Sequence, residues 1–256
     1  MAATIKEPWE RDVMRVSGRI VATGLDILRG MIKPGASTGE LDAAFEEHVR
    51  SHDAFPTFKG YRGFPASICS SINEEVVHGI PSFDRILKEG DLLSIDCGAT
   101  YKGYVGDSCM SMGVGKINEQ TQRLMDITRE SLEKGIEAMG PNVPLSQVSG
   151  AIQKHAEDHG YSIVRKYVGH GIGREMHEDP QVPNYVIEGY EFMLRPGVVL
   201  AIEPMLNIGT EDVKTLSDDW TVVTMDNKLS CHSEHTIAVT ETGVEVLTRR
   251  ESEKTS

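Results

Sequence analysis

The sequence has little of what marks secreted, membrane or nucleic-acid-binding proteins. Its four cysteines, at positions 69, 97, 109 and 231, form no CxxC pair, which argues against a zinc knuckle and a disulfide framework. No apolar run approaches the ~20 residues of a membrane span, and "MAATIKEPWERD" lacks the basic start and apolar stretch of a signal peptide. A net charge of −13 repels phosphate backbones. We therefore expect a cytoplasmic protein without membrane or direct nucleic-acid partners.

The chain does have enough apolar sequence for a substantial core. Its 256 residues, 39% of them hydrophobic, fit one large domain or two of ordinary size. Apolar residues at helical spacing, together with capping and breaking residues, predict four amphipathic helices. The predicted helices cover residues 9–31, 37 or 38 to about 52, 120–139 and 146–159.

A shift of 107 positions superimposes two parts of the chain. It aligns one predicted helix with another and the run "GDLLSID" with "GVVLAIE", so that Asp96 falls on Glu203. The identities are Pro34, Ala44, His48 and His52 on Pro141, Ala151, His155 and His159, and Gly90, Leu93 and Ile95 on Gly197, Leu200 and Ile202. Such a repeat predicts two similar halves around a pseudo-twofold axis, each bringing a strand-end carboxylate to the middle.

The stretch "GDLLSIDCGATYKGYVGD", residues 90–107, predicts a hairpin that buries two carboxylates. The letters "YKG" at 101–103 mark a tight turn between two strand-like runs. Asp96 and Asp107 are eleven positions apart, which places them opposite or diagonally opposite on one face of the hairpin. Because two carboxylates so close repel each other, one stays protonated unless a cation neutralises both. The hairpin therefore indicates a metal site.

Three further segments carry side chains that bind metals. "VGHGIGREMHEDP" contains His170, "AIEP" contains Glu203 and "SEHT" contains Glu234. With the two aspartates they make four carboxylates and one imidazole. This oxygen-rich set disfavours a thiolate-type structural zinc site and suits a pair of Mn, Fe or Co ions, with Zn as a further candidate. Such a pair lowers the pKa of a shared water molecule and polarises a carbonyl, which is the chemistry of metal-assisted hydrolysis.

Each of these residues also has an ordinary structural interpretation. An aspartate after a strand is commonly a turn or cap residue, and a strand-end glutamate before proline is usually solvated. His170 and His177 also suit polar positions on a glycine-rich loop. The combination favours the metal site, because the repeat independently brings Asp96 and Glu203 together.

Six segments, taken in order, resemble the signature blocks of the type I methionine aminopeptidases. They are "SINEEVVHGIP", "GDLLSIDCGATYKGYVGDS", "VGHGIGREMHEDPQVPNY", "AIEPMLNIG", "DDWTVVT" and "SEHTIAVT", and the resemblance extends over about residues 9–248. The resemblance implies an α+β pita-bread fold, in which an antiparallel β-sheet is flanked by helices in two pseudo-symmetric halves. It also implies removal of N-terminal methionine by a hydroxide that two divalent metal ions activate.

Carried over residue by residue, the resemblance implies roles for the metal-binding and catalytic side chains. Asp107 and Glu234 would bridge the ions, Asp96 would chelate one of them, and His170 and Glu203 would bind the other. The family's roles also make Glu203 the group that moves a proton from the nucleophile to the leaving amine. His78 would lie near the scissile amide, and His177 would donate to the carbonyl oxygen as it becomes an oxyanion.

The resemblance also implies a methionine-sized pocket and a second kind of cation site. The implied pocket residues are Phe58, Tyr61, Phe64, Cys69, Met176 and Trp220. Phe58 stands where the best-known bacterial enzymes have cysteine, and Met176 where they have phenylalanine, so the shape of the pocket should differ. Less directly, similarity implies one Na⁺ or K⁺ ion near Asn73, the backbone of Glu75 and Ser230.

Length and spacing select among related proteins. Thirty residues separate Glu203 from Glu234, which leaves no room for the helical insert of type II enzymes, so the chain resembles the short bacterial form. Xaa-Pro aminopeptidases share the ligands but typically carry a large N-terminal domain, whereas creatine-hydrolysing relatives and binding-only modules of this fold lack the ligands. An Xaa-Pro enzyme and a non-catalytic peptide-binding module remain the alternatives.

These observations lead to expectations about organisation and partners. We expect residues 1–248 to form a single metallopeptidase domain, and residues 249–256, "RRESEKTS", to be a disordered tail. By resemblance, the substrate is the N-terminal methionine of nascent polypeptides, the ribosome is a further candidate partner, and the protein is a monomer.

Overall fold

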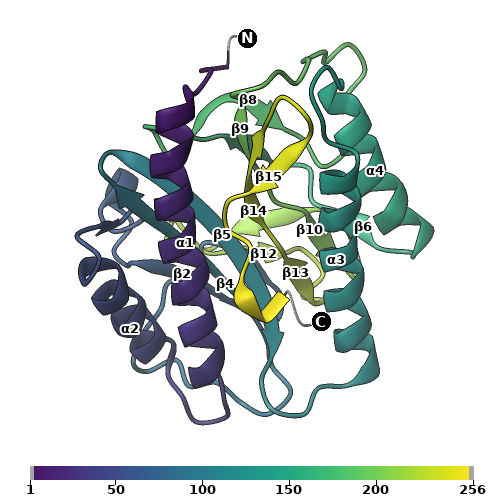
Figure 1. The fold of residues 1–256 in the computed structure, drawn as a ribbon. Helices are drawn as coiled ribbons and strands as arrows, with labels where there is room; N and C mark the ends of the chain where they lie inside the picture. The colour runs from purple at the N-terminus through teal and green to yellow at the C-terminus, as the bar shows by residue number, and fades with distance from the viewer. Residues whose placement is uncertain (1–2, 254–256) are drawn as a thin grey trace.

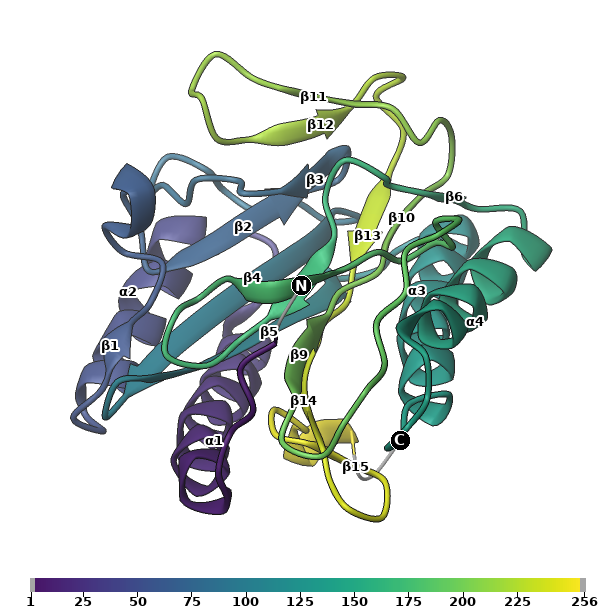
Figure 2. The same ribbon diagram turned by 90° about the horizontal axis from the view of Figure 1, so that it is seen from above.

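Four helices flank a set of antiparallel strands in the computed structural model, which describes residues 3–253 (Figures 1 and 2). Helices α1 and α2 cover one half of the molecule, and α3 and α4 cover the other. The bounds are Pro8–Met31 for α1, Thr38–Arg50 for α2, Glu119–Glu137 for α3 and Leu145–Asp158 for α4, with single 3-10 turns at Tyr61–Gly63 and Glu251–Glu253. Each end lies within two residues of its prediction.

Local capping explains where the helices begin. The α1 helix has Pro8 in its first turn, where proline needs no hydrogen-bond donor, and Glu10 reaches back to the backbone N–H of Glu7. Ser37 and Glu40 form a reciprocal capping box at the start of α2. Within residues 3–253, every helix is too short or too polar to span a lipid bilayer.

The strands form four small antiparallel sheets. The first sheet has the order β1-β4-β2 with β5 paired to β4, and the second has the order β15-β14-β9-β7-β8. The two smaller sheets are β13-β10-β6 and β11-β12-β3. The bounds are β1 Phe55–Pro56, β2 Ile68–Ile72, β3 Glu75–Val77, β4 Leu92–Tyr101, β5 Tyr104–Gly113, β6 Ser162–Ile163, β7 Gly169–Gly171, β8 Glu178–Val182, β9 Val199–Ile202, β10 Met205–Asn207, β11 Val213–Thr215, β12 Val222–Thr224, β13 Ser230–His232, β14 His235–Val239 and β15 Val244–Val246.

The predicted internal repeat is present in the backbone. The isolated bridge Ser37↔Ile86 has its counterpart, 107 positions later at both ends, in Pro144↔Met193. The same shift relates the hydrogen bond from Gly35 N to Leu87 O, at 2.9 Å, to the one from Asn142 N to Leu194 O, at 2.8 Å. Further matched features are the positive φ angles of Gly90 and Gly197 and the ring contacts His48–His52 and His155–His159. The expectation of two pseudo-symmetric halves is confirmed.

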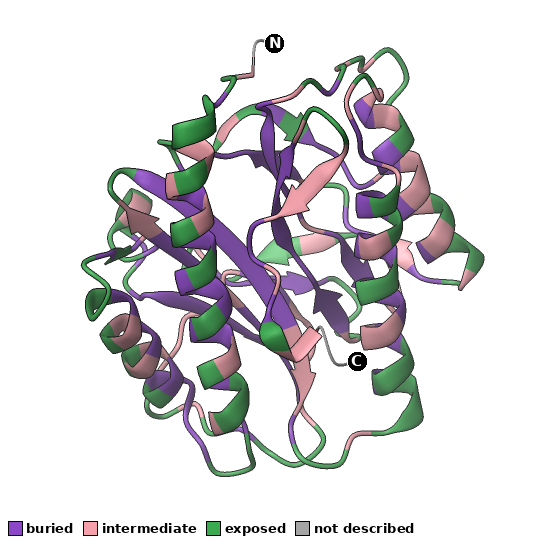
Figure 3. Cartoon of the chain, in the orientation of Figure 1, coloured by how far each residue is buried: buried purple, intermediate pink, exposed green. Residues whose placement is uncertain are grey.

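Each half has its own apolar core under its own helices. In the first half, Leu93 and Ile95 of β4 pack with Leu25 and Leu28 of α1, and all four side chains are fully buried. The corresponding core of the second half includes Leu200 and Ile202 of β9 with residues of α3 and α4. Figure 3 shows the buried strands at the centre and the exposed outer faces of the helices. The strands are therefore supported on their helical side, and their other side is available for a site.

The halves meet where β5 lies against β14. Asp107 N donates to Thr236 Oγ1 at 3.0 Å, and Thr236 Oγ1 donates to Asp107 O at 2.8 Å. Glu234 N donates to Cys109 O at 3.1 Å. These bonds bring the backbones of Asp107 and Glu234 together across the pseudo-twofold axis, although they are 127 positions apart in the sequence.

The start of the expected disordered tail is ordered. The guanidinium of Arg249 pairs with Glu133 of α3, and buried Arg250 pairs with Glu253. Ser252 Oγ donates to Asp26 of α1 at 2.6 Å. The expectation of disorder is therefore wrong for residues 249–253, because an ion pair to α3 and a hydrogen bond to α1 fix this charged segment between the two halves. Residues 254–256 lie outside the described part of the chain.

Candidate active site

The hairpin of the first half holds its two aspartates on one face. β4 and β5 are joined by the two residues between Tyr101 and Tyr104, as the sequence predicts. Asp96 pairs with Cys109, and Gly98 pairs with Asp107, so the two aspartates are diagonal neighbours. Because side chains two positions apart on a strand point the same way, both carboxylates face the second half.

The second half supplies one ligand from each of three adjacent strands. His170 lies on β7, Glu203 directly follows β9, and Glu234 directly precedes β14. His170 Nε2 lies 3.8 Å from Asp107 Oδ2 and 3.6 Å from Glu203 Oε1. One potential ligand atom from each of Asp107, His170 and Glu234 lies within 4.8 Å of the others. All five predicted ligand residues line one cavity.

Keeping these buried carboxylates ionised costs free energy unless a cation is present. Asp107 and Glu234 are each only 2% exposed. Burial raises the pKa of Asp96 to about 7. Burial, together with the charge of neighbouring carboxylates, raises the pKa values of Asp107, Glu203 and Glu234 well above their usual range. A divalent cation reverses this effect, because it favours the ionised carboxylates.

The donor atoms suit a divalent metal. Asp96 Oδ1, Asp107 Oδ1 and Glu234 Oε1 are buried, and none has a hydrogen-bond partner within residues 3–253. His170 donates from Nδ1 to the carbonyl of Gly171 at 2.9 Å, which leaves the lone pair on Nε2 toward the carboxylates. Burial lowers the pKa of His170 to about 3, so the imidazole is neutral and able to bind a metal. The residues present therefore fit such an ion.

The predicted pocket residues surround the same cavity, whose volume is about 320 Å³. Phe58, Phe64, Cys69 and Met176 are buried walls, each 8% exposed or less. Trp220 closes one side, with its ring 5.1 Å from that of Phe64 in an edge-on contact. The predicted substrate-binding residues on this lining are Phe58, Tyr61, Phe64, Cys69, His78, Met176, His177 and Trp220.

The two accessory histidines approach the cavity differently. His177 Nδ1 lies 2.8 Å from the hydroxyl of Tyr61, and its ring centroid is 4.3 Å from that of His170. His78 has a positive φ of 61°, which is uncommon for a residue other than glycine and indicates a constrained backbone. Burial lowers the pKa of His78 to about 4, so its ring is neutral at physiological pH.

The residues predicted to hold a monovalent cation lie on neighbouring segments. Ser230 N donates to Asn73 O at 2.9 Å. Glu75 begins β3, and its carboxylate is occupied by Arg85 at 2.7 Å and by the backbone N–H of Ile72. The hydroxyl of Ser230 is buried and lacks a hydrogen-bond partner among the described residues.

Part of the site was not predicted from the sequence. His232 is 2% exposed, and its Nε2 lies 3.9 Å from Glu203 Oε2. His232 lies two residues before Glu234, and side chains two positions apart in an extended chain point to the same side. This spacing could have indicated that His232 faces the site. Five further residues that line the cavity were also missed: Arg62, Val77, Lys166, Tyr167 and Val168.

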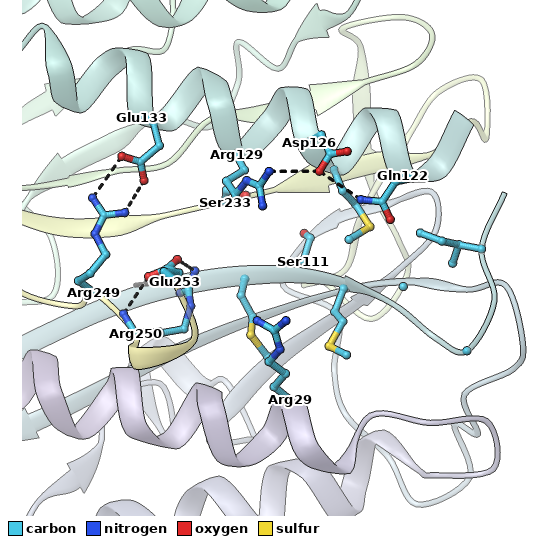
Figure 4. Close-up of a pocket in the computed structure, with 16 residues that line it drawn as sticks. Arg29, Ser111, Gln122, Asp126, Arg129, Glu133, Ser233, Arg249, Arg250 and Glu253 are labelled. Atoms are coloured by element: carbon cyan, nitrogen blue, oxygen red, sulfur yellow. Dashed lines mark hydrogen bonds and ion pairs between the residues drawn. The ribbon is translucent and has the colours of Figure 1, made fainter. Parts of the chain in front are cut away.

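A larger cavity of about 830 Å³ lies between α1, α3 and the C-terminal segment (Figure 4). Its charged side chains are largely satisfied by each other. Arg249 pairs with Glu133, and Arg129 lies 3.3 Å from Asp126. The metal-capable group of the described residues lies in the smaller cavity. Size alone therefore does not identify the active site.

Known proteins resemble this chain over nearly its whole length. The model of metallopeptidase family M24 matches residues 12–241. Methionine aminopeptidase 1 of Bacillus subtilis is 52% identical over 95% of this chain and 98% of its own length. Methionine aminopeptidase of Escherichia coli (strain K12) is 43% identical, over 99% and 96% respectively. The crystal structure of methionine aminopeptidase from Thermotoga maritima superposes with a TM-score of 0.95 at 43% identity, covering 97% of this chain and 100% of that one. The chain therefore belongs to metallopeptidase family M24, among the methionine aminopeptidases of the short type I form.

Proposed function

We propose that this chain removes the N-terminal methionine from nascent polypeptides whose second residue is small. The observation that supports this most directly is the convergence of Asp107, His170 and Glu234 within 4.8 Å, at a cavity of about 320 Å³ with apolar and aromatic walls. Such a cavity suits a flexible thioether beside a group that hydrolyses amides. Similarity to methionine aminopeptidases over almost the whole chain supports the same activity.

Two divalent cations, drawn from Co, Mn, Fe and Zn, are the cofactors we propose. Asp107 and Glu234 would be shared ligands, Asp96 would hold one ion, and His170 with Glu203 would hold the other. When bound, such ions lower the pKa of water and polarise the scissile carbonyl. Charge supports two rather than one, because four carboxylates balance two divalent cations.

The remaining steps belong to side chains. The hydroxyl of Tyr61 lies 2.8 Å from His177 Nδ1. We assign the hydroxyl as the donor, which places the proton of the neutral ring on Nε2. We assign that N–H to the carbonyl oxygen of the substrate, where it stabilises the developing negative charge. The carboxylate of Glu203 takes the proton from the nucleophile and passes it to the leaving amine. Neutral His78 is assigned to the scissile amide.

The side-chain pocket explains the choice of methionine in this proposal. Phe58, Phe64 and Trp220 supply aromatic surface, and Met176 supplies an adaptable wall. Phe58 and Met176 replace the cysteine and phenylalanine of the best-known bacterial pattern, so we expect inhibitors to distinguish this pocket from those enzymes while the reaction is unchanged.

The wider setting is also a proposal. We assign residues 1–248 to a single catalytic domain that acts as a monomer in the cytoplasm. Nascent chains are its substrates, so the ribosome is the place where it would meet them. A single Na⁺ or K⁺ ion near Asn73, the backbone of Glu75 and Ser230 is supported by the buried hydroxyl of Ser230 that lacks a hydrogen-bond partner in residues 3–253.

Peptide cleavage tests the proposal against its alternatives. The purified chain, loaded with Co²⁺ or Mn²⁺, is incubated with Met-Ala-Ser and with Ala-Pro-Ala, and the released amino acids are measured. We expect methionine from the first peptide and no release from the second. Release of alanine from Ala-Pro-Ala alone would assign the site to an Xaa-Pro enzyme. No hydrolysis of either peptide by a metal-loaded sample would leave a binding module.

A further inference from the structure

The N-terminal segment, residues 3–7, places a buried lysine beside the loop that precedes β8. Lys6 is only 3% exposed, and its Nζ lies 2.6 Å from Glu178 Oε2. The side chain of Glu178 is 11% exposed. Lysine is almost never fully buried unless it is paired, because removing an ammonium from water costs more than most pairings return. This ion pair therefore requires an explanation beyond surface charge.

The partner carboxylate organises the loop that carries His177. Glu178 Oε1 accepts hydrogen bonds from the backbone N–H of Arg174, at 2.8 Å, and of Glu175, at 3.3 Å. Residues 173–177 form bends rather than a helix or strand. One carboxylate thus holds both ends of a short irregular loop, with Lys6 bound to its other oxygen.

Two glycines leave room for Lys6. A Cβ on Gly173 would lie 2.4 Å from Lys6 Cε, and a Cβ on Gly197 would lie 2.9 Å from Lys6 O. Lys6 N also donates to Gly197 O at 2.7 Å. Lys6 is therefore fixed along its backbone and its side chain, so that the position of its ammonium is well defined.

The loop presents its residues directly to the cavity. His177 precedes Glu178, and its ring lies against that of His170. Met176 is 8% exposed and lines the same cavity. A shift of this loop would therefore displace both His177, which is assigned a catalytic role, and Met176, which forms a wall of the side-chain pocket.

We propose that Lys6 is a positioning residue for methionine removal, which holds the 173–178 loop through Glu178 and so directs His177 at the substrate. This inference rests on the proposed function. Displacement of a catalytic group by about 1 Å costs on the order of 100-fold in rate. We expect Lys6→Met to lower kcat/KM by about 10- to 100-fold, mainly through kcat, because His177 is assigned to the transition state.

A double-mutant cycle separates positioning from general stability. Lys6→Met, His177→Ala and the double variant are compared on Met-Ala-Ser in metal-loaded enzyme, and their thermal unfolding is recorded. If Lys6 acts through His177, we expect Lys6→Met to change kcat/KM by less than about threefold when His177 is already absent. A merely structural role would give the same kinetic loss in both backgrounds and would overturn the proposal.

Two further variants provide a second test of the ion pair and a control for it. Glu178→Gln removes the charge of the partner and should show the same dependence on His177, even where Lys6→Met fails to fold. Arg15→Met is the matched control, because it breaks another ion pair between the N-terminal region and the second half, at 2.6 Å from Glu245, away from the cavity. We expect the control to retain kcat/KM within about twofold, as is usual for an exposed pair.

A spectroscopic readout does not depend on activity. In metal-free enzyme, the imidazole ¹⁵N resonances of His177, identified by their loss in His177→Ala, should shift in Lys6→Met and stay in place in Arg15→Met. Unshifted resonances in a folded Lys6→Met protein would overturn the inference. Should the wild-type chain fail to release methionine, the proposed function falls, and these resonances still decide whether Lys6 positions the ring.

Discussion

The two halves of the molecule use the same backbone plan but close it differently. The first half joins β4 to β5 by a two-residue turn, so Asp96 and Asp107 come from one rigid hairpin. The second half has the equivalent strand in β9, but the chain passes through β10–β13 before it returns in β14. Consequently Glu203 and Glu234 are 31 positions apart, whereas Asp96 and Asp107 are 11 apart.

This difference separates metal binding from substrate recognition. The carboxylates at the axis are matched in the two halves, as expected for a site that balances charge symmetrically. The additional segment β10–β13 of the second half includes Trp220, and the loop before β8 includes Met176 and His177. We therefore attribute the carboxylates of the metal site to the shared plan. The imidazole of His170, whose counterpart in the first half is Ser71, and the orientation of substrate come from what the second half adds.

Removing a carboxylate from either half should have the largest effect. Asp96→Ala and Glu203→Ala, which are related by the 107-residue shift, are each expected to lose bound metal and to reduce methionine release to background, because three carboxylates no longer balance two divalent cations. Elemental analysis of the purified variants, alongside the peptide assay, measures both effects. Full metal occupancy in Asp96→Ala would mean that Asp107 and the three ligands of the second half hold the ions without Asp96, and would contradict the charge argument.

His177→Ala should retain the metal but slow the reaction. In the first half, β2 pairs with β4 as β7 pairs with β9, and Ser71 is the counterpart of His170. Because β2 contains no histidine, it offers no substitute. We expect kcat to fall on the order of 100-fold, which is typical of removing one donor to a developing oxyanion. Steady-state kinetics and elemental analysis of the same sample test this. Unchanged kcat would remove the role assigned to His177.

The matched glycines should respond unequally to alanine. Gly90 and Gly197 have φ angles of 91° and 89°, so each Gly→Ala change costs about 1–2 kcal/mol of backbone strain. At Gly90 the nearest atom to a new Cβ is 3.9 Å away, whereas at Gly197 Ile5 Cγ2 lies at 2.6 Å. We expect Gly197→Ala to be less stable than Gly90→Ala by about 1–3 kcal/mol. Urea unfolding measures the free energy of unfolding of both variants. Equal losses of stability would show that the N-terminal segment moves aside from the new Cβ at no energetic cost.

Trp220→Ala tests whether the segment β10–β13 contributes to substrate recognition. The indole forms one wall of the cavity and packs edge-on against Phe64. Its loss should raise KM for Met-Ala-Ser by about tenfold, because one apolar pocket contact contributes about 1–3 kcal/mol, and should leave the metal content unchanged. A loss confined to kcat would instead place Trp220 with the transition-state residues.

The smallest predicted effect is on stability, from removing a charge that only the first half has. Glu46 of α2 is replaced by Gln153 at the corresponding position of α4. Hydrogen bonding to Lys59 lowers the pKa of Glu46 to about 2, so its stabilisation is present above its ordinary value of 4.5 and is lost as the pH falls toward 2. We expect Glu46→Gln to lose up to about 1 kcal/mol at pH 7, because the group is partly exposed, and less at pH 3. Unfolding curves at the two pH values compare it with wild type, and a constant difference would contradict the assignment.

Local patterns determined how much of the fold and site could be predicted. Helix ends follow from residues such as Ser37 and Glu40, and the hairpin follows from its turn, so both are legible in a short window of sequence. The repeat extended this to a long-range relation, because Asp96 and Glu203 are equivalent positions of the two halves and line the same cavity.

Other features depend on tertiary contacts that no short window contains. The segment 249–253 resembles a charged tail, but Glu133 and Asp26 hold it in place. His232 resembles an ordinary strand residue, and only the approach of Glu203 brings it into the site. Lys6 gives no sign of burial, because its partner is 172 positions away.

Calorimetric titration of Mn²⁺ or Co²⁺ into metal-free enzyme shows whether the five side chains at the axis bind two divalent ions. Because burial raises the pKa values of Asp107, Glu203 and Glu234, binding should displace protons as well as fill the site. We expect about two ions per chain and a release of protons, which makes the measured heats depend on the ionisation enthalpy of the buffer. Failure to bind divalent ions, or binding without proton release, would contradict it.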